Sequence, residues 1–109
     1  MKGSVVLVPF PFTDFSATKL RPAIVLYEND SDVVVAFISS RIPAIMTPAD
    51  IPVSRSQPGF PATGLKTDSV IRLDKIATII RTRVAGRIGE LPPELRSRVN
   101  EKITGLYRI

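Results

Sequence analysis

Residues 21–39 read RPAIVLYENDSDVVVAFIS, and this stretch decides the fold class. Its two halves are runs of apolar, largely β-branched side chains, and the polar residues 28–31 (ENDS) separate them. Such runs on either side of a polar turn are typical of two strands joined as an antiparallel hairpin. We therefore predict strands over residues 21–27 and 32–39.

The register of this hairpin depends on the length of its turn. If the loop is the three residues 29–31, Arg21 lies opposite Ser39 on the same face, with Cβ atoms about 5 Å apart. A two-residue turn would instead place Arg21 opposite Ile38 or Ser40, because a slip of one residue exchanges the two faces.

The rest of the chain alternates short β-rich runs with loops rich in proline and glycine, which cannot continue a strand ladder. Only after Pro92 does the apolar period become helical, and prolines suit the first turn of a helix. We predict a mainly β fold with one C-terminal helix, a small barrel or strongly bent sheet forming a single domain over residues 1–109. The further predicted strands cover residues 2–8, 51–54, 69–73 and 75–84, and the apolar helix stripe is Leu95, Val99, Ile103 and Leu106.

Several residue types that carry chemistry are missing from the chain. Its 109 residues include no His and no Cys. These absences exclude Ser-His-Asp and Cys-His machinery, imidazole or thiolate metal sites and disulfides. Catalysis would therefore depend on Arg, Lys, Ser, Thr, Tyr, Asp or Glu side chains, and we expect neither a metal nor another cofactor. No apolar run approaches the roughly 20 residues of a membrane-spanning helix, so we expect a cytoplasmic protein with no membrane partner.

The net charge of +5 is unevenly distributed along the chain. Residues 1–71 hold six basic and six acidic side chains, whereas residues 72–109 hold nine basic and four acidic ones. A one-sided basic surface favours a polyanion such as RNA or DNA, or an acidic protein partner. A solvated basic face without a specific ligand is the alternative.

Arg21 and Ser39 are the first candidates for a site, because both would lie where proline-rich loops leave the sheet. A guanidinium offers a planar fork of donors to a phosphate, and a hydroxyl adds one more hydrogen bond. The alternative is structural: Arg21 pairs with Asp14 or Glu28 at the surface, and Ser39 only ends a strand. From the residues alone both interpretations stay open.

Three blocks of the chain resemble the MazF/PemK family of toxins from bacterial toxin–antitoxin pairs. The first block joins VLVPFPFTD at residues 6–14 to KLRPAIVL at residues 19–26. The second is AFISS at residues 36–40, and the third is TDSVIRLDKIATI at residues 67–79. The predicted C-terminal helix also falls where the family has one, so the resemblance covers nearly the whole chain.

The resemblance implies an SH3-like barrel, usually a homodimer, that acts as a sequence-selective, metal-independent endoribonuclease on single-stranded RNA. An acidic antitoxin blocks the site of such toxins. The family's key pair, an arginine of the "RP" motif and a hydroxyl residue that ends the third strand, corresponds to Arg21 and Ser39, which we predict to be catalytic. The family position of Ser39 is commonly threonine, and serine keeps the hydroxyl but loses the methyl group that restricts its rotamer.

Contacts to RNA are predicted around this pair. Aromatic side chains of the first loop could stack on splayed bases or instead plug the end of the barrel, and we favour the plug for Phe10. Arg81 and Arg83 alternate on one predicted strand face and suit backbone phosphates, unless that edge is only solvated. The acceptor for the 2′-hydroxyl proton stays open between Asp14 and Asp74. The predicted RNA-binding residues are Phe12, Thr13, Lys19, Ser40, Ser69, Arg81 and Arg83.

Two other functions compete with RNA cleavage. One is a catalytically inactive relative that binds RNA or an acidic partner without cutting. The other is a toxin that poisons DNA gyrase on a related fold, and the basic end of the chain over residues 98–108 argues against the gyrase contact this would need. An apolar helix stripe is more often core than partner surface, so the homodimer rests on the resemblance alone.

Overall fold

The computed structural model describes residues 1–9 and 19–109. Within these residues, six strands form one antiparallel sheet in the order β4-β5-β3-β2-β1-β6, and one α-helix follows them. The strands are β1 (Ser4–Pro9), β2 (Leu20–Glu28), β3 (Asp32–Ser39), β4 (Asp50–Val53), β5 (Ser69–Ile80) and β6 (Gly86–Glu90); the helix is α1 (Pro93–Leu106), and two 3₁₀ helices are η1 (Phe60–Thr63) and η2 (Arg81–Arg83).

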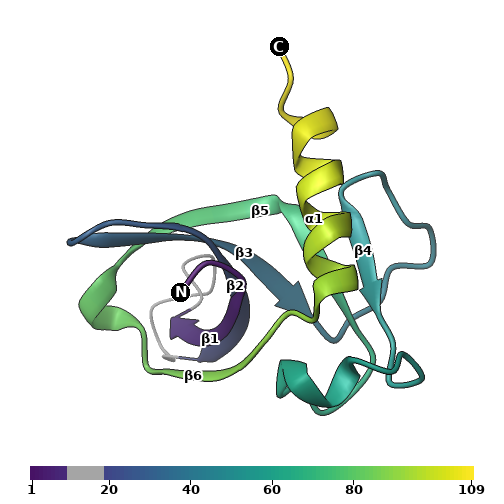
Figure 1. Cartoon of the computed structure of the whole chain (residues 1–109), viewed down its shortest axis with the longest axis horizontal. Coiled ribbons are helices and arrows are strands. Elements are labelled where there is room, and N and C mark those ends of the chain that lie inside the picture. Colours follow the sequence, from purple (N-terminus) through teal and green to yellow (C-terminus); the bar gives the residue numbers. More distant parts are fainter. Residues whose placement is uncertain (10–18) are drawn as a thin grey trace.

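The sheet curls into a half-barrel, and α1 lies across it beside β4 and β5 (Figure 1). Leu95 and Val99 of α1 are buried against this sheet, and Ile103 and Leu106 pack against the same cluster. The predicted stripe is therefore core, and the prediction of a mainly β fold with one C-terminal helix is confirmed. Within the described ranges, no helix is long and apolar enough to cross a membrane.

Both faces of the central strands are covered. One apolar cluster joins Ile24, Ala36 and Ile71 to the helix, and the other joins Val25 and Val35 with their neighbours on the opposite face. A strand buried on both faces reads as a continuous apolar run. This explains why β3 shows no alternation of apolar and polar residues.

The predicted register holds at one end of the β2–β3 hairpin and fails at the other. Near the turn, Glu28 pairs with Val33, so the three-residue loop was wrong. An irregularity between Val25 and Tyr27 then shifts the pairing by one residue. From Val25 toward the open end of the hairpin the pairing follows the predicted register, with Ala23 facing Phe37.

Residues 69–84 differ from the two strands predicted there. They contain one strand, β5, whose residues 73–75 have no partner in β3, because Ala36 faces Ile76 and Phe37 faces Arg72. The predicted break at Asp74 is this bulge. Arg81 to Arg83 form η2 rather than the end of a strand, so the two arginines do not alternate on one strand face as predicted.

The sequence prediction missed β6, which contains Gly86 and Gly89 and therefore has a low strand propensity. Packing requires glycine at position 89, because a Cβ there would lie 2.4 Å from the carbonyl oxygen of Ala62. Gly64, after η1, has φ of +73° and would place a Cβ 2.1 Å from the carbonyl oxygen of Ile88. β6 and the end of η1 thus approach each other too closely for any side chain.

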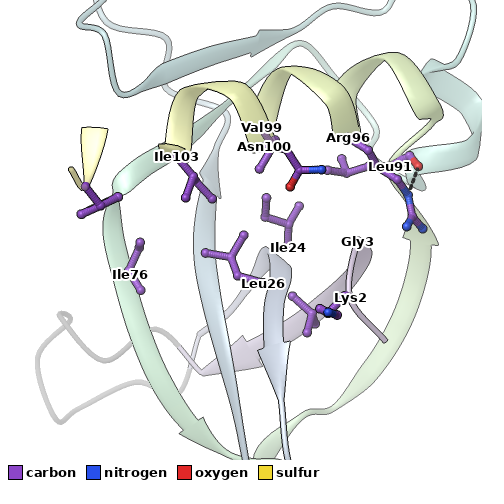
Figure 2. A pocket seen from close by; sticks show the side chains of 12 residues that line it. Lys2, Gly3, Ile24, Leu26, Ile76, Leu91, Arg96, Val99, Asn100 and Ile103 are labelled. Carbon is purple, nitrogen blue, oxygen red and sulfur yellow. Dashed lines mark hydrogen bonds between the residues drawn. The ribbon is translucent and has the colours of Figure 1, made fainter. Parts of the chain in front are cut away.

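A cavity of about 320 Å³ lies between α1 and the sheet (Figure 2). Ile24, Leu26 and Ile76 project into it from the strands, and Val99 and Ile103 from the helix. At its rim, Nε of Arg96 donates a hydrogen bond of 3.2 Å to the carbonyl oxygen of Leu91 (Figure 2). Among the described residues, its lining contains none of the predicted site residues.

Candidate functional site

The sheet register places Arg21 and Ser39 on one face. Ala23 pairs with Phe37, and Arg21 and Ser39 each stand two residues beyond this pair on their strands. Side chains two residues apart share a face, so both belong to the face of Phe37. Ser39 in turn pairs with Val70 of β5. Arg21 and Ser39 therefore share a face, although the three-residue turn from which we predicted this does not form.

A cavity of about 490 Å³ opens beside these two residues. Both Arg21 and Ser39 line it, together with the predicted Lys19 and Ser40. Nine of the described residues line it; five of these are cationic, and none of them carries a carboxylate. A concave site lined by one sign of charge concentrates counter-ions, so this cavity suits a polyanion. The nine lining residues are Lys19, Arg21, Phe37, Ile38, Ser39, Ser40, Arg41, Arg72 and Lys75.

The Ser39 hydroxyl has a defined position. The backbone N–H of Arg41 donates a hydrogen bond of 3.0 Å to its oxygen. The hydroxyl itself lies 3.5 Å from the Arg41 carbonyl oxygen, at the limit of a hydrogen bond. A phosphate oxygen in the cavity would be a better acceptor for the hydroxyl proton than this long contact.

Arg72 is tied to two carboxylates. Its Nε lies 2.8 Å from Oδ1 of Asp50 and 3.7 Å from Oδ1 of Asp74. Asp50 is a buried residue of β4 that faces Arg72 across the sheet, whereas Asp74 is exposed on the bulge of β5. In contrast, Lys19, Arg41 and Lys75 form no ion pair with any residue that the structure describes.

Three other predicted RNA-binding residues lie outside this cavity. Ser69 is buried at the start of β5, and its hydroxyl donates a hydrogen bond of 2.9 Å to the Thr67 carbonyl oxygen. Arg81 follows the last residue of β5, and its Nη1 donates 3.0 Å to the carbonyl oxygen of Asn29 at the hairpin turn. Ser39 ends β3 at its other end, so about 23 Å of strand separates it from Arg81 and Arg83.

Phe12, Thr13 and Asp14 lie outside the described residues. In the part of the chain that is described, no group of three or more His, Cys, Asp or Glu side chains is arranged to hold a metal ion.

Sequence reasoning missed three cations of the cavity: Arg41, Arg72 and Lys75. Arg41 directly follows the predicted pair of serines, so its position in the chain was a usable signal. Arg72 and Lys75 both lie within the third family-like block, and the direction of their side chains depends on the bulge over residues 73–75. The sequence predicted a break at Asp74, but nothing in it indicated that both cations would line this cavity.

The sequence matches the family model of the PemK-like, MazF-like toxins of type II toxin–antitoxin systems over residues 1–107. No curated protein matches the chain.

Solved structures share the fold. The chain is similar to the Mycobacterium tuberculosis toxin MazF-mt6, with a TM-score of 0.71 and 20% identity, over 94% of this chain and 93% of that one. It is also similar to an endoribonuclease in complex with its cognate antitoxin from a Mycobacterial species, with a TM-score of 0.71 and 17% identity, over 100% and 98% of the two chains. With its sequence matched along nearly the full length and its fold shared, the chain belongs to the PemK-like, MazF-like toxins of type II toxin–antitoxin systems.

Proposed function

We propose that this protein is a toxin that cleaves single-stranded RNA at selected sequences without a metal ion, and that a cognate acidic antitoxin neutralises it. One observation carries the proposal: Arg21 and Ser39 line the same strongly basic cavity at one end of the hairpin. Family membership and the endoribonuclease named among the similar structures support the same reaction.

The proposed reaction uses a nucleophile that RNA itself carries. The ribose 2′-oxygen gives its proton to a base and attacks the adjacent phosphorus, and the bond from phosphorus to the 5′-oxygen breaks as that oxygen takes up a proton. The products are a 2′,3′-cyclic phosphate and a free 5′-hydroxyl. The protein must align the attack and stabilise the charge on the phosphorane, and both tasks suit fixed hydrogen-bond donors.

Arg21 and Ser39 divide these tasks. The Arg21 guanidinium binds the scissile phosphate with its fork of donors and stabilises the phosphorane electrostatically. Because a guanidinium hardly loses a proton, we assign it no acid role. The Ser39 hydroxyl, with its oxygen held by the Arg41 N–H, donates to a non-bridging phosphate oxygen.

The remaining predicted residues serve RNA binding in this proposal. Lys19 and Ser40 line the cavity and contact flanking phosphates. Phe12 and Thr13 read the bases, with the aromatic ring as a stacking surface. Arg81 and Arg83 lie too far away to contact the scissile phosphate, so they would meet only RNA that extends along the hairpin.

Two protein contacts belong to the proposal. The basic cavity is complementary to an acidic antitoxin, which would block it by competing with RNA. A homodimer is proposed from family membership, and light scattering of the purified protein tests it. Exposed apolar side chains on the loop after β3, namely Ile42, Ile45 and Met46, supply surface for a protein contact.

Cleavage of a long mixed-sequence RNA in EDTA tests the activity. The wild-type protein should release discrete fragments with 5′-hydroxyl ends, and sequencing the ends identifies the preferred cut site. Arg21→Ala should abolish the fragments. Arg98→Ala removes one positive charge from an exposed helix position outside the cavity and serves as the matched control. Intact RNA after incubation with folded, antitoxin-free wild-type protein would overturn the proposal.

A non-cleaving RNA-binding relative is the second candidate. The hydrogen bond from the Arg41 N–H already uses one acceptor site of the Ser39 hydroxyl oxygen. The position of Ser39 commonly holds threonine in this family. This candidate predicts RNA binding that is lost in Arg21→Ala, with no cleavage by the wild-type protein.

A further inference from the structure

We infer that Arg72 is a second phosphate-binding arginine of this cavity and that the buried Asp50 is the positioning residue that aims it. The inference rests on the proposed function, because the ligand is a backbone phosphate of single-stranded RNA next to the scissile one.

Arg72 has a defined place in the sheet. It pairs with Phe37 on one side and with Asp50 on the other, so its side chain is on the face that also holds Arg21 and Ser39. Two strand spacings and a two-residue offset put the Cα atoms of Arg21 and Arg72 about 12 Å apart. Two long arginine side chains at this separation can reach neighbouring phosphates of one strand.

The carboxylate of Asp50 anchors the Arg72 guanidinium. The Asp50 side chain is 1% exposed, and its Oδ2 accepts hydrogen bonds from the Thr47 N–H at 2.9 Å and the Thr47 hydroxyl at 3.2 Å. These bonds leave Oδ1 facing Nε of Arg72 at 2.8 Å. Neither of these two buried atoms has a hydrogen-bond partner among the described residues, so the attraction between them is Coulombic. A buried carboxylate is stable only with a cationic partner, so the Asp50 carboxylate holds the Arg72 guanidinium in place.

The contact with Asp50 leaves the terminal nitrogens of Arg72 available to a ligand. Nε faces Asp50, but within the described ranges neither Nη1 nor Nη2 of Arg72 has a hydrogen bond. The side chain is 28% exposed and lines the cavity. The two terminal nitrogens carry four N–H donors in a rigid plane, the arrangement that grips a phosphate through two oxygens.

The two carboxylates beside Arg72 can affect RNA binding through their charge or by positioning the guanidinium. Asp50 and Asp74 offset the charge of Arg72, so charge alone predicts that removing either carboxylate strengthens RNA binding. If Asp50 instead positions the Arg72 guanidinium, the removal of Asp50 and the removal of Asp74 should have opposite effects on RNA binding. Loss of the buried carboxylate releases the guanidinium and weakens binding, whereas loss of the exposed one does not.

The experiment measures binding of a short 2′-O-methyl RNA that carries the cut sequence mapped for the wild-type protein, and the methyl group prevents cleavage. We expect Arg72→Ala to raise Kd about tenfold, the size of one charge-assisted hydrogen bond. The slope of log Kd against log salt should fall by about 0.7, as for one lost phosphate contact. Arg72→Lys should restore the salt slope but only part of the affinity, because lysine lacks the fork.

Asp50→Asn and Asp74→Asn form the matched pair, since each removes one negative charge beside Arg72. We expect Asp50→Asn to weaken binding several-fold and Asp74→Asn to leave it equal or tighter. Thermal unfolding confirms that each variant is folded. If Asp50→Asn does not fold, Thr47→Ala loosens the anchor instead, and it should weaken binding in the same way.

Tighter binding by both asparagine variants, or an unchanged salt slope in Arg72→Ala, would overturn the inference. Neither result would affect the proposed function, which is tested by cleavage and its loss in Arg21→Ala. If the wild-type protein does not cleave RNA, the same binding series on a mixed-sequence 2′-O-methyl pool still decides the role of Arg72.

Discussion

The backbone N–H of Arg41 donates a hydrogen bond of 3.0 Å to the hydroxyl oxygen of Ser39. Serine lacks the methyl group that restricts a threonine rotamer, and this hydrogen bond holds the oxygen in its place. Because the donor is a main-chain group, the restraint does not depend on the identity of residue 41. The hydroxyl can then rotate to donate its proton to a nearby acceptor, which in the proposed complex is a phosphate oxygen.

Ser39→Ala should reduce the cleavage rate about 10²–10³-fold, the usual cost of removing one donor to a developing charge. Ser39→Thr should keep at least the wild-type rate, because it retains the hydroxyl and adds the methyl group. Single-turnover cleavage of an RNA containing the mapped cut site measures both. Equal rates for the alanine variant and the wild-type protein would remove Ser39 from the mechanism.

Arg83→Ala should weaken the binding of long RNA and leave the binding of short RNA unchanged. Arg83 lies about 23 Å of strand away from Ser39, beyond a short oligonucleotide held in the cavity. We expect unchanged Kd for a short 2′-O-methyl RNA and weaker binding of a long one, measured side by side. Arg21→Ala should weaken both, and a loss on the short RNA in Arg83→Ala would contradict this geometry.

Two glycine substitutions should change stability in opposite directions. Gly64→Ala combines a φ of +73° with a Cβ 2.1 Å from the Ile88 carbonyl oxygen, so we expect it to lower the free energy of unfolding by about 1–3 kcal/mol. Gly105→Ala lies in α1, where a Cβ meets nothing within 4 Å, and should raise it by up to about 1 kcal/mol. Urea denaturation measures both changes. A stable Gly64→Ala would show that η1 and β6 can separate at little cost.

Tyr107→Phe should also lower the free energy of unfolding. The Tyr107 hydroxyl donates a hydrogen bond to the carbonyl oxygen of Leu73, which ties the residue after α1 to the bulge of β5. Losing it should cost about 1 kcal/mol. Tyr27→Phe is the matched control, because the Tyr27 ring is half exposed and its hydroxyl bonds to no described residue. Equal stability of the two variants would mean that this bond contributes nothing.

The hairpin shows how far sequence reasoning reaches. The apolar runs of β2 and β3 were predictable because burial on both faces requires them. The predicted loop was wrong, yet Arg21 and Ser39 share a face because an irregularity beside Leu26 restores the register. The position of such a bulge depends on packing against neighbouring strands, and no residue in this stretch predicts it.

The end of β5 shows the opposite case. Its β-branched residues predicted a strand through residue 84, but the chain turns into η2 after Ile80. There the backbone N–H of Arg81 donates to the carbonyl oxygen of Ser31, at the hairpin turn. Local propensity could not anticipate a turn stabilised by a segment about fifty residues earlier in the chain.

The sequence by itself determined the mainly β class and the C-terminal helix, because these depend on local composition and periodicity. The sequence did not show which basic residues line the cavity beside Arg21 and Ser39. The excess of basic residues follows residue 71, yet Lys19, Arg21 and Arg41, which line the cavity, come from the part with no net charge. Only the tertiary structure joins them to Arg72 and Lys75, since a curled sheet with bulges brings together residues that no sequence spacing relates.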